Sequence, residues 1–176
     1  MSEPGEQLYY ALKGDNNKVN ELINRHGGFN KVLDEDGYTA LHWAAAYRDI
    51  PILQKIWKMM KPDIDQKNDS GNTPLHSASY FGELPSVEWC VGHGSDPQAI
   101  NNENKTAKDY AKSRQRTEVV KFLDKVDSMK ELFPVKEVSP LNLFSIGNYA
   151  KKLEEYLTNV GTDDPEVINY VCFTFL

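Results

Sequence analysis

A ten-residue block recurs along the chain at a nearly constant distance, and this repeat restricts the fold more than any other feature. The block at 36–45 returns at 70–79, and a weaker copy stands at 103–112. The copies begin 34 and 33 residues apart. A period of this length is typical of repeat proteins, in which each unit buries its apolar face against the next. We therefore expect a stacked array of similar units.

Each block is followed by apolar residues at the spacing of a helix. Residues three or four positions apart share one helix face, so each group predicts an amphipathic helix. Every unit is then a helix, a turn and a second helix. The residues are Ile52, Leu53 and Ile56 in the first unit, Val87 and Val91 in the second, and Val119, Val120 and Leu123 in the third.

The residue types inside the block suit a tight turn that leads into a helix. Gly37 and Gly71 allow the positive φ that such a turn needs. Asn104 stands there in the third copy, and asparagine tolerates the left-handed region better than most residues. The threonine at the fourth position of every copy is a natural N-cap. Pro74 fits the first helical position, where a missing N–H costs nothing.

This pattern resembles the ankyrin repeat: a Gly turn, Thr-Pro-Leu-His-x-Ala, a second helix, and a closing Gly-Ala-Asp, here Gly94-Ser95-Asp96. The resemblance implies an all-α ankyrin-repeat solenoid of three to four helix-turn-helix repeats with β-turn fingers. It also implies a structural role for His42 and His76, which would hydrogen-bond across the turn. The repeats are placed at about 6–33, 34–67, 68–100 and 101–126, which makes 1–126 the ankyrin-repeat domain.

Two departures from the family pattern stand out. Arg48-Asp49 occupies the place where the family favours Gly-His. Lys108-Asp109 replaces Leu-His in the third copy, which suits a terminal repeat whose outer face meets water.

Residues 127–176 match no pattern that we recognise. Apolar residues from Ile146 to Val160 follow helical spacing, and a second short helix or a strand is expected after Pro165. We expect a short C-terminal helical appendage. It acts as a cap on the last repeat, as a partner-binding tail, or as the start of another domain.

Motifs of catalysis and cofactor binding are missing from the sequence. It has no Gly-rich phosphate loop, no Gly-x-Ser-x-Gly and no His-Glu-x-x-His. His42 and His76 could meet as metal ligands, but a turn-tying role is favoured. Cys90 falls on a helix face expected to be buried. We therefore expect no catalytic residues, no metal, no cofactor and no enzymatic activity.

Charge and cysteine content limit the partners and the compartment. The net charge of −6 argues against nucleic acid, although 101–126 is a basic block. No apolar run approaches the length of a membrane span. Two cysteines and no signal peptide favour the cytoplasm or the nucleus. We expect a monomer that binds neither membrane nor nucleic acid.

The resemblance implies that a partner protein binds the concave face, which the turn tips and first helices form. On this basis the chain is expected to be an adaptor or regulatory scaffold that binds a peptide or loop with apolar and basic residues. One alternative is a regulatory or inhibitory subunit whose 127–176 segment contacts the target. In another, Tyr47, Tyr80 and Phe81 pack between repeats. The predicted binding residues are Asp36, Tyr38, Trp43, Tyr47, Asp69, Asn72, Tyr80, Phe81, Glu103 and Arg114.

Overall fold

Helices dominate the computed structural model, which describes residues 3–60 and 62–132. Within these residues there are eight α-helices, one short 3-10 helix and no strand. Predictions about 133–176 lie outside them. The elements are α1 (Pro4–Leu12), α2 (Asn16–His26), η1 (Phe29–Lys31), α3 (Ala40–Ala46), α4 (Ile50–Met60), α5 (Pro74–Phe81), α6 (Leu84–Gly92), α7 (Ala107–Ser113) and α8 (Thr117–Leu132).

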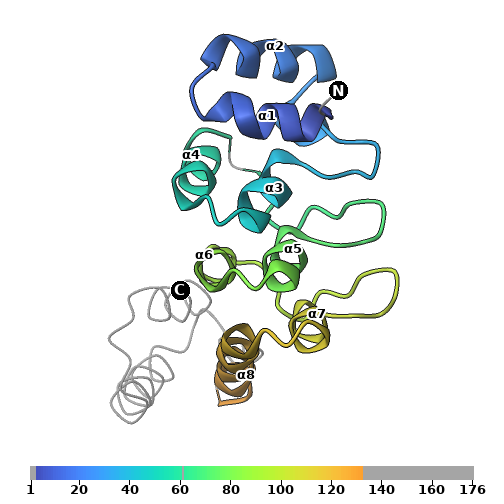
Figure 1. Ribbon diagram of the computed structural model, residues 1–176, viewed down its shortest axis with the longest axis vertical. Helices are drawn as coiled ribbons and strands as arrows, with labels where there is room; N and C mark the ends of the chain where they lie inside the picture. The colour runs from blue at the N-terminus through green and yellow to red at the C-terminus, as the bar shows by residue number, and fades with distance from the viewer. Residues whose placement is uncertain (1–2, 61, 133–176) are drawn as a thin grey trace, which may run out of the picture.

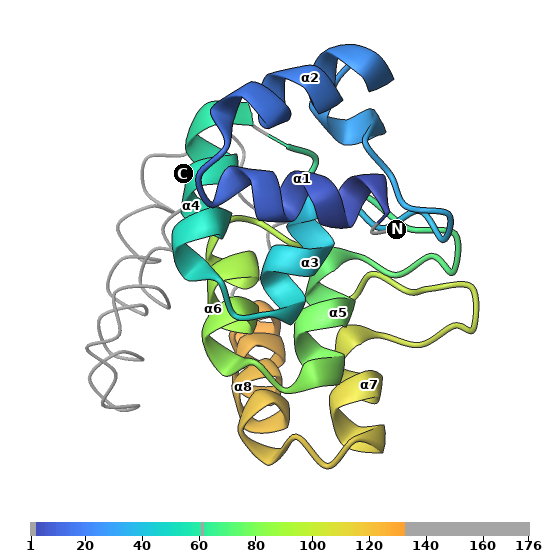
Figure 2. The same ribbon diagram turned by 45° about the horizontal axis from the view of Figure 1, so that its top comes forward.

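The helices form four consecutive pairs that stack along one axis (Figure 1). The first helices of the pairs, α1, α3, α5 and α7, follow one another along the stack and pack against their neighbours. The second helices lie beside them as another layer, and the connecting loops project from one side as fingers (Figure 2). The predicted all-α solenoid fold is thus confirmed.

The finger tips have the left-handed conformation that the sequence predicts. Gly37 and Gly71 both have φ of 77°, and Asn104 has φ of 57°. Neighbouring fingers are also joined, because the N–H of Asp69 donates to the Asp36 carbonyl at 3.1 Å. A Cβ on Gly37 would lie 2.9 Å from the Asp69 nitrogen, so glycine also permits this close approach. The fingers therefore form a continuous hydrogen-bonded edge.

Each first helix of the three clear repeats begins at its threonine with a capping box. The Thr39 hydroxyl accepts from the His42 N–H at 3.3 Å, and the His42 ring accepts from the Thr39 N–H at 3.2 Å. The second copy repeats this arrangement. In the third, the Asp109 carboxylate accepts from the Thr106 N–H at 2.9 Å. The predicted N-caps are confirmed.

The two repeat histidines do more than close their own turns. His42 Nε2 donates to the Asn72 carbonyl at 3.0 Å, and His76 Nε2 donates to the Lys105 carbonyl at 3.1 Å. Each of these carbonyls belongs to the following finger. Each histidine therefore links its repeat to the next one.

The first helix pair has no threonine cap, and a carboxylate from the next finger replaces it. Glu3, the N-cap of α1, makes no side-chain cap bond. Instead, the buried Asp34 accepts from the N–H groups of Gly5 at 2.6 Å and Glu6 at 3.2 Å. A helix N-terminus exposes unpaired N–H groups and favours negative charge, so Asp34 stabilises α1 from outside.

Helix α8 runs to Leu132, so the boundary drawn between 126 and 127 falls inside a helix. The Lys108 amino group of α7 also pairs with Asp127, and with Asp124 at 3.3 Å. Lys108, which replaces the leucine of the family pattern, therefore holds α7 against α8 and does not only face water. These ion pairs tie residues on both sides of the predicted boundary to α7, so the last repeat continues past residue 126.

Candidate functional site

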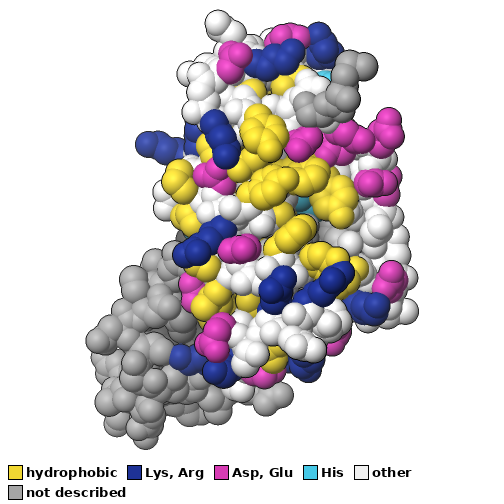
Figure 3. All heavy atoms as spheres, viewed as in Figure 1, with side chains coloured by type: hydrophobic (Ala, Val, Ile, Leu, Met, Phe, Trp, Pro, Cys, Tyr) yellow, Lys and Arg dark blue, Asp and Glu magenta, His cyan; other side chains and the backbone are white. Residues whose placement is uncertain are grey.

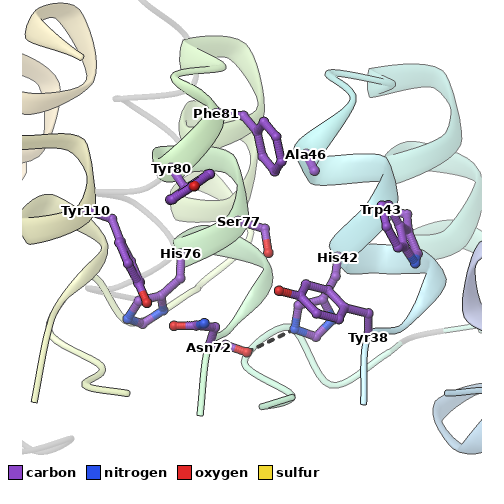
Figure 4. A pocket seen from close by; sticks show the side chains of 10 residues that line it. All are labelled: Tyr38, His42, Trp43, Ala46, Asn72, His76, Ser77, Tyr80, Phe81 and Tyr110. Atoms are coloured by element: carbon purple, nitrogen blue, oxygen red, sulfur yellow. Dashed lines mark hydrogen bonds between the residues drawn. The ribbon is translucent and has the colours of Figure 1, made fainter. Parts of the chain in front are cut away.

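An open hollow of about 330 Å³ lies where α3, α5 and α7 meet the fingers (Figure 4). Most of its wall is aromatic, and its residues come from three successive repeats. It is lined by Tyr38, His42, Trp43, Ala46, Asn72, His76, Ser77, Tyr80, Phe81 and Tyr110.

One wall is the end of a continuous row of aromatic rings, which we call the N-terminal row: Tyr10, Tyr9, Tyr47, Trp43 and Tyr38. Successive ring centroids lie 5.1, 5.4, 5.6 and 5.6 Å apart. Trp43 and Tyr47 are stacked at 20°. These separations suit favourable aromatic contacts, and the row crosses the first two repeats with Tyr10 and Tyr47 exposed and Tyr9 buried.

The opposite wall is a second row, the C-terminal row: Phe81, Tyr80, Tyr110 and His76. Their successive centroids are 5.2, 5.8 and 5.9 Å apart, with the rings edge to face. Phe81 leans from α5 toward Ala46 of α3 at the mouth of the hollow (Figure 4). The hollow therefore separates two aromatic surfaces.

Small residues leave the space between the rows open. Ala46 and Ser77 are 8% and 6% exposed and carry short side chains. Asn72 completes the floor, and its Oδ1 accepts from the Asn101 side chain at 2.9 Å. A side chain from another molecule could thus enter between the two rows.

Trp43 is held in place by the same carboxylate that caps α1. Its indole N–H donates to Asp34 Oδ2 at 2.6 Å. This bond satisfies the only polar atom of the ring and fixes its orientation. The indole then offers an apolar surface to the hollow.

The two histidines at the back of the hollow are neutral. Burial lowers the pKa of His42 to about 4, although the Asn72 carbonyl bond opposes this shift. Burial also lowers the pKa of His76. The interior wall is therefore uncharged at neutral pH, which suits apolar occupants.

Metal-binding and reactive groups are not found in the described part of the chain. Residues 3–60 and 62–132 contain no group of three potential metal ligands. Cys90 is fully buried, and burial raises the pKa of its thiol. The thiol is therefore an uncharged part of the core. In the same segments, no helix has the length and apolar character that crossing a bilayer demands.

Comparison with known proteins shows which family this helical architecture resembles. The family described as ankyrin repeats in three copies matches residues 46–131. Residues 46–131 are therefore identified as ankyrin repeats. Ankyrin repeats are generally non-catalytic modules for protein–protein interaction, although some related proteins are multidomain enzymes.

Several curated relatives share this domain. The chain is 35% identical over 89 residues to the 26S proteasome non-ATPase regulatory subunit 10 of Dictyostelium discoideum, which covers 51% of this chain. It is 29% identical over 70 residues, 40% of the chain, to ankyrin repeat domain-containing protein 49 of Bos taurus. It is 24% identical over 123 residues, 69% of the chain, to the putative E3 ubiquitin-protein ligase XBAT35 of Arabidopsis thaliana. The matches span only 27% to 38% of these relatives' own lengths.

Half of the ten predicted binding residues of the ankyrin domain line the hollow itself. The exposed fractions of Tyr47 and Phe81 are 48% and 47%, so neither ring is buried between repeats, whereas Tyr80 is half-buried and contacts Tyr110 of the next repeat. Tyr47 lies outside the hollow, behind Trp43 in the N-terminal row. The five residues in the hollow are Tyr38, Trp43, Asn72, Tyr80 and Phe81.

The charged members of that set lie around the hollow rather than in it. Asp36 and Asp69 stand exposed on neighbouring finger tips. Glu103, on the third finger, is paired with Lys105 at 2.6 Å, so its charge is partly neutralised. Arg114 lies over the Tyr80 ring, 4.1 Å from its centroid. Figure 3 shows the hydrophobic band with acidic side chains gathered along one side.

Sequence reasoning missed several aromatic members of the site. Tyr110 occupies the same place in its repeat as Trp43 and Ser77, so the repeat period could have found it. Tyr9 and Tyr10 belong to the degenerate first repeat, where the motif is too weak to align. No local signal pointed to Asp34, because its three donors come from other parts of the chain.

Proposed function

We propose that this ankyrin domain binds a partner protein on its concave face, with the hollow as the anchoring site for a peptide or loop. The observation that carries the proposal is the open, aromatic-walled hollow between two ring rows, in which Tyr47 and Phe81 are exposed. Aromatic side chains are enriched at interface hot spots, and an exposed apolar cluster of this kind marks interaction sites. Because the walls are preformed, the partner would bind with little ordering cost in this chain.

A paired substitution tests the anchoring role. Phe81→Ala, combined with Tyr80→Ala, should weaken partner binding by more than about 2 kcal/mol if these rings are hot spots. Met59→Ala is a matched control, because Met59 is similarly exposed, at 54%, but lies on α4 outside the hollow. Affinity capture with the full chain and both variants, each checked for folding by circular dichroism, compares the recovered proteins.

A protein that is lost from the Tyr80/Phe81 variant and retained by the Met59 variant would support the proposal. If capture is equal for all three, the hollow is not the binding site. A fourth bait ending at Leu132 tests the alternative that residues beyond α8 contact the target. This bait leaves α8 whole, whereas a chain ending at Val126 would cut it.

A further inference from the structure

Opposite charges flank the two walls of the hollow. Exposed acids lie on the finger tips beside the hollow, and arginines lie beside the C-terminal row. Charge placed around an apolar site selects partners and orients them more than it adds affinity. The positions of these acidic and basic side chains therefore indicate which charges a partner segment in the hollow would carry.

The acidic side consists of Asp36 and Asp69. The two finger tips are held together by the backbone bond from Asp69 to Asp36, so their positions are fixed relative to each other. Asp36 stands two residues before Tyr38, which lines the hollow, and the pKa of Tyr38 is raised by burial first and by the charge of Asp36 as well. Among residues 3–60 and 62–132, no lysine or arginine pairs with either acid.

The basic side consists of Arg114 and Arg116. Arg114 lies against the Tyr80 ring and hydrogen-bonds to its hydroxyl, and Arg116 Nε donates to the Tyr80 carbonyl at 3.4 Å. Neither arginine forms an ion pair with a carboxylate in the described part of the chain. A guanidinium carries five donors, so both can still bind a carboxylate.

We infer that the hollow binds a partner segment with an apolar or aromatic anchor residue, flanked by a basic residue on the finger side and an acidic residue on the Arg114 side. The inference rests on the proposed function and adds a direction to it. In the opposite direction, like charges would face each other at both ends. The charge pattern therefore sets which way the segment lies.

A displayed library of random peptides, selected on the full chain, tests this direction. We expect enriched peptides to share an apolar anchor with a basic residue on one side and an acidic residue on the other. A synthetic enriched peptide should bind about tenfold more tightly than the same peptide with its two charges exchanged, because two attractive contacts become repulsive.

Charge reversal of the protein provides the decisive comparison. Because Asp69 and Arg116 remain, Asp36→Lys combined with Arg114→Glu should cancel the preference, so that the two peptides bind about equally well. Lys58→Glu is the control, since Lys58 is exposed on α4 and should leave the preference unchanged.

The failures of the two proposals differ. If no enriched peptide loses binding to the Tyr80/Phe81 variant, the proposed function is wrong and the direction with it. If peptides need those rings but show no charge order, or if charge reversal leaves their preference unchanged, only the inferred direction is overturned.

Discussion

Three equivalent positions end the first helix of a repeat in the left-handed conformation, and only one of them is glycine. Gly82 has φ of 82°, Arg48 has φ of 55° and Gln115 has φ of 58°. For a residue with a Cβ, the left-handed conformation costs about 1–2 kcal/mol of conformational free energy. The departure from the family pattern at Arg48 therefore has a structural cost that can be measured.

Arg48→Gly should raise the free energy of unfolding by about 0.5–1 kcal/mol, because relief of backbone strain outweighs the greater flexibility of the unfolded glycine. Chemical denaturation measures the difference. Arg48→Ala is the control, since it removes the same side chain but keeps the Cβ, and it should bring no gain. Equal stability of the two variants would contradict the strain argument.

At the scale of elements, the Asp34 side chain binds both the start of α1 and the α3 wall of the hollow. Asp34 accepts from two N–H groups at the start of α1 and from the indole of Trp43 on α3. It therefore couples the degenerate first repeat to the wall of the hollow. Loss of this side chain would leave three donors unpaired, two of them at a helix terminus.

Asp34→Ala should lower the free energy of unfolding by about 2 kcal/mol, since buried unpaired donors are costly. Hydrogen exchange should accelerate in α1, with α5 and α7 little affected, because each repeat contacts only its neighbours. Asp36→Ala in the same finger is the matched control, and its exposed side chain should contribute less than about 0.5 kcal/mol. Uniform acceleration along the stack would argue against a local role for Asp34.

At the scale of the whole molecule, buried histidines join consecutive repeats, and this makes the stack sensitive to acid. The pKa of His42 is lowered to about 4 in the folded chain, from an ordinary value of 6.5. Below 6.5 the unfolded chain binds a proton that the folded chain does not. Stability is thus complete above about 6.5 and falls as the pH drops toward about 4.

The free energy of unfolding should fall by about 1.5 kcal/mol between pH 6.5 and pH 5 through His42 alone. Denaturation at several pH values measures this slope. His42→Gln should flatten the profile in that window, because glutamine can still close a capping box but does not titrate. If the slope is the same in the variant, His42 is not the group responsible.

The local elements of the fold were predictable because their causes lie within a few residues. Thr39, Gly37 and Asn104 act through their own backbone conformation or through a bond to the same turn. The repeat period then extended these local rules along the chain. It placed a first repeat at about 6–33, but the weak motif there did not point to Tyr9 and Tyr10, and the members of the hollow stayed incomplete.

The sequence by itself determined the repeat unit, its caps and turns and the all-α class, since each follows from residue type at a fixed spacing. Only the tertiary structure decided that two ring rows face each other across a hollow, that Asp34 holds Trp43, and that acids and arginines take opposite sides. The contacts between repeats join residues about 30 positions apart, and even the bond from Trp43 to Asp34 spans nine positions. Their geometry exists only after the repeats have stacked.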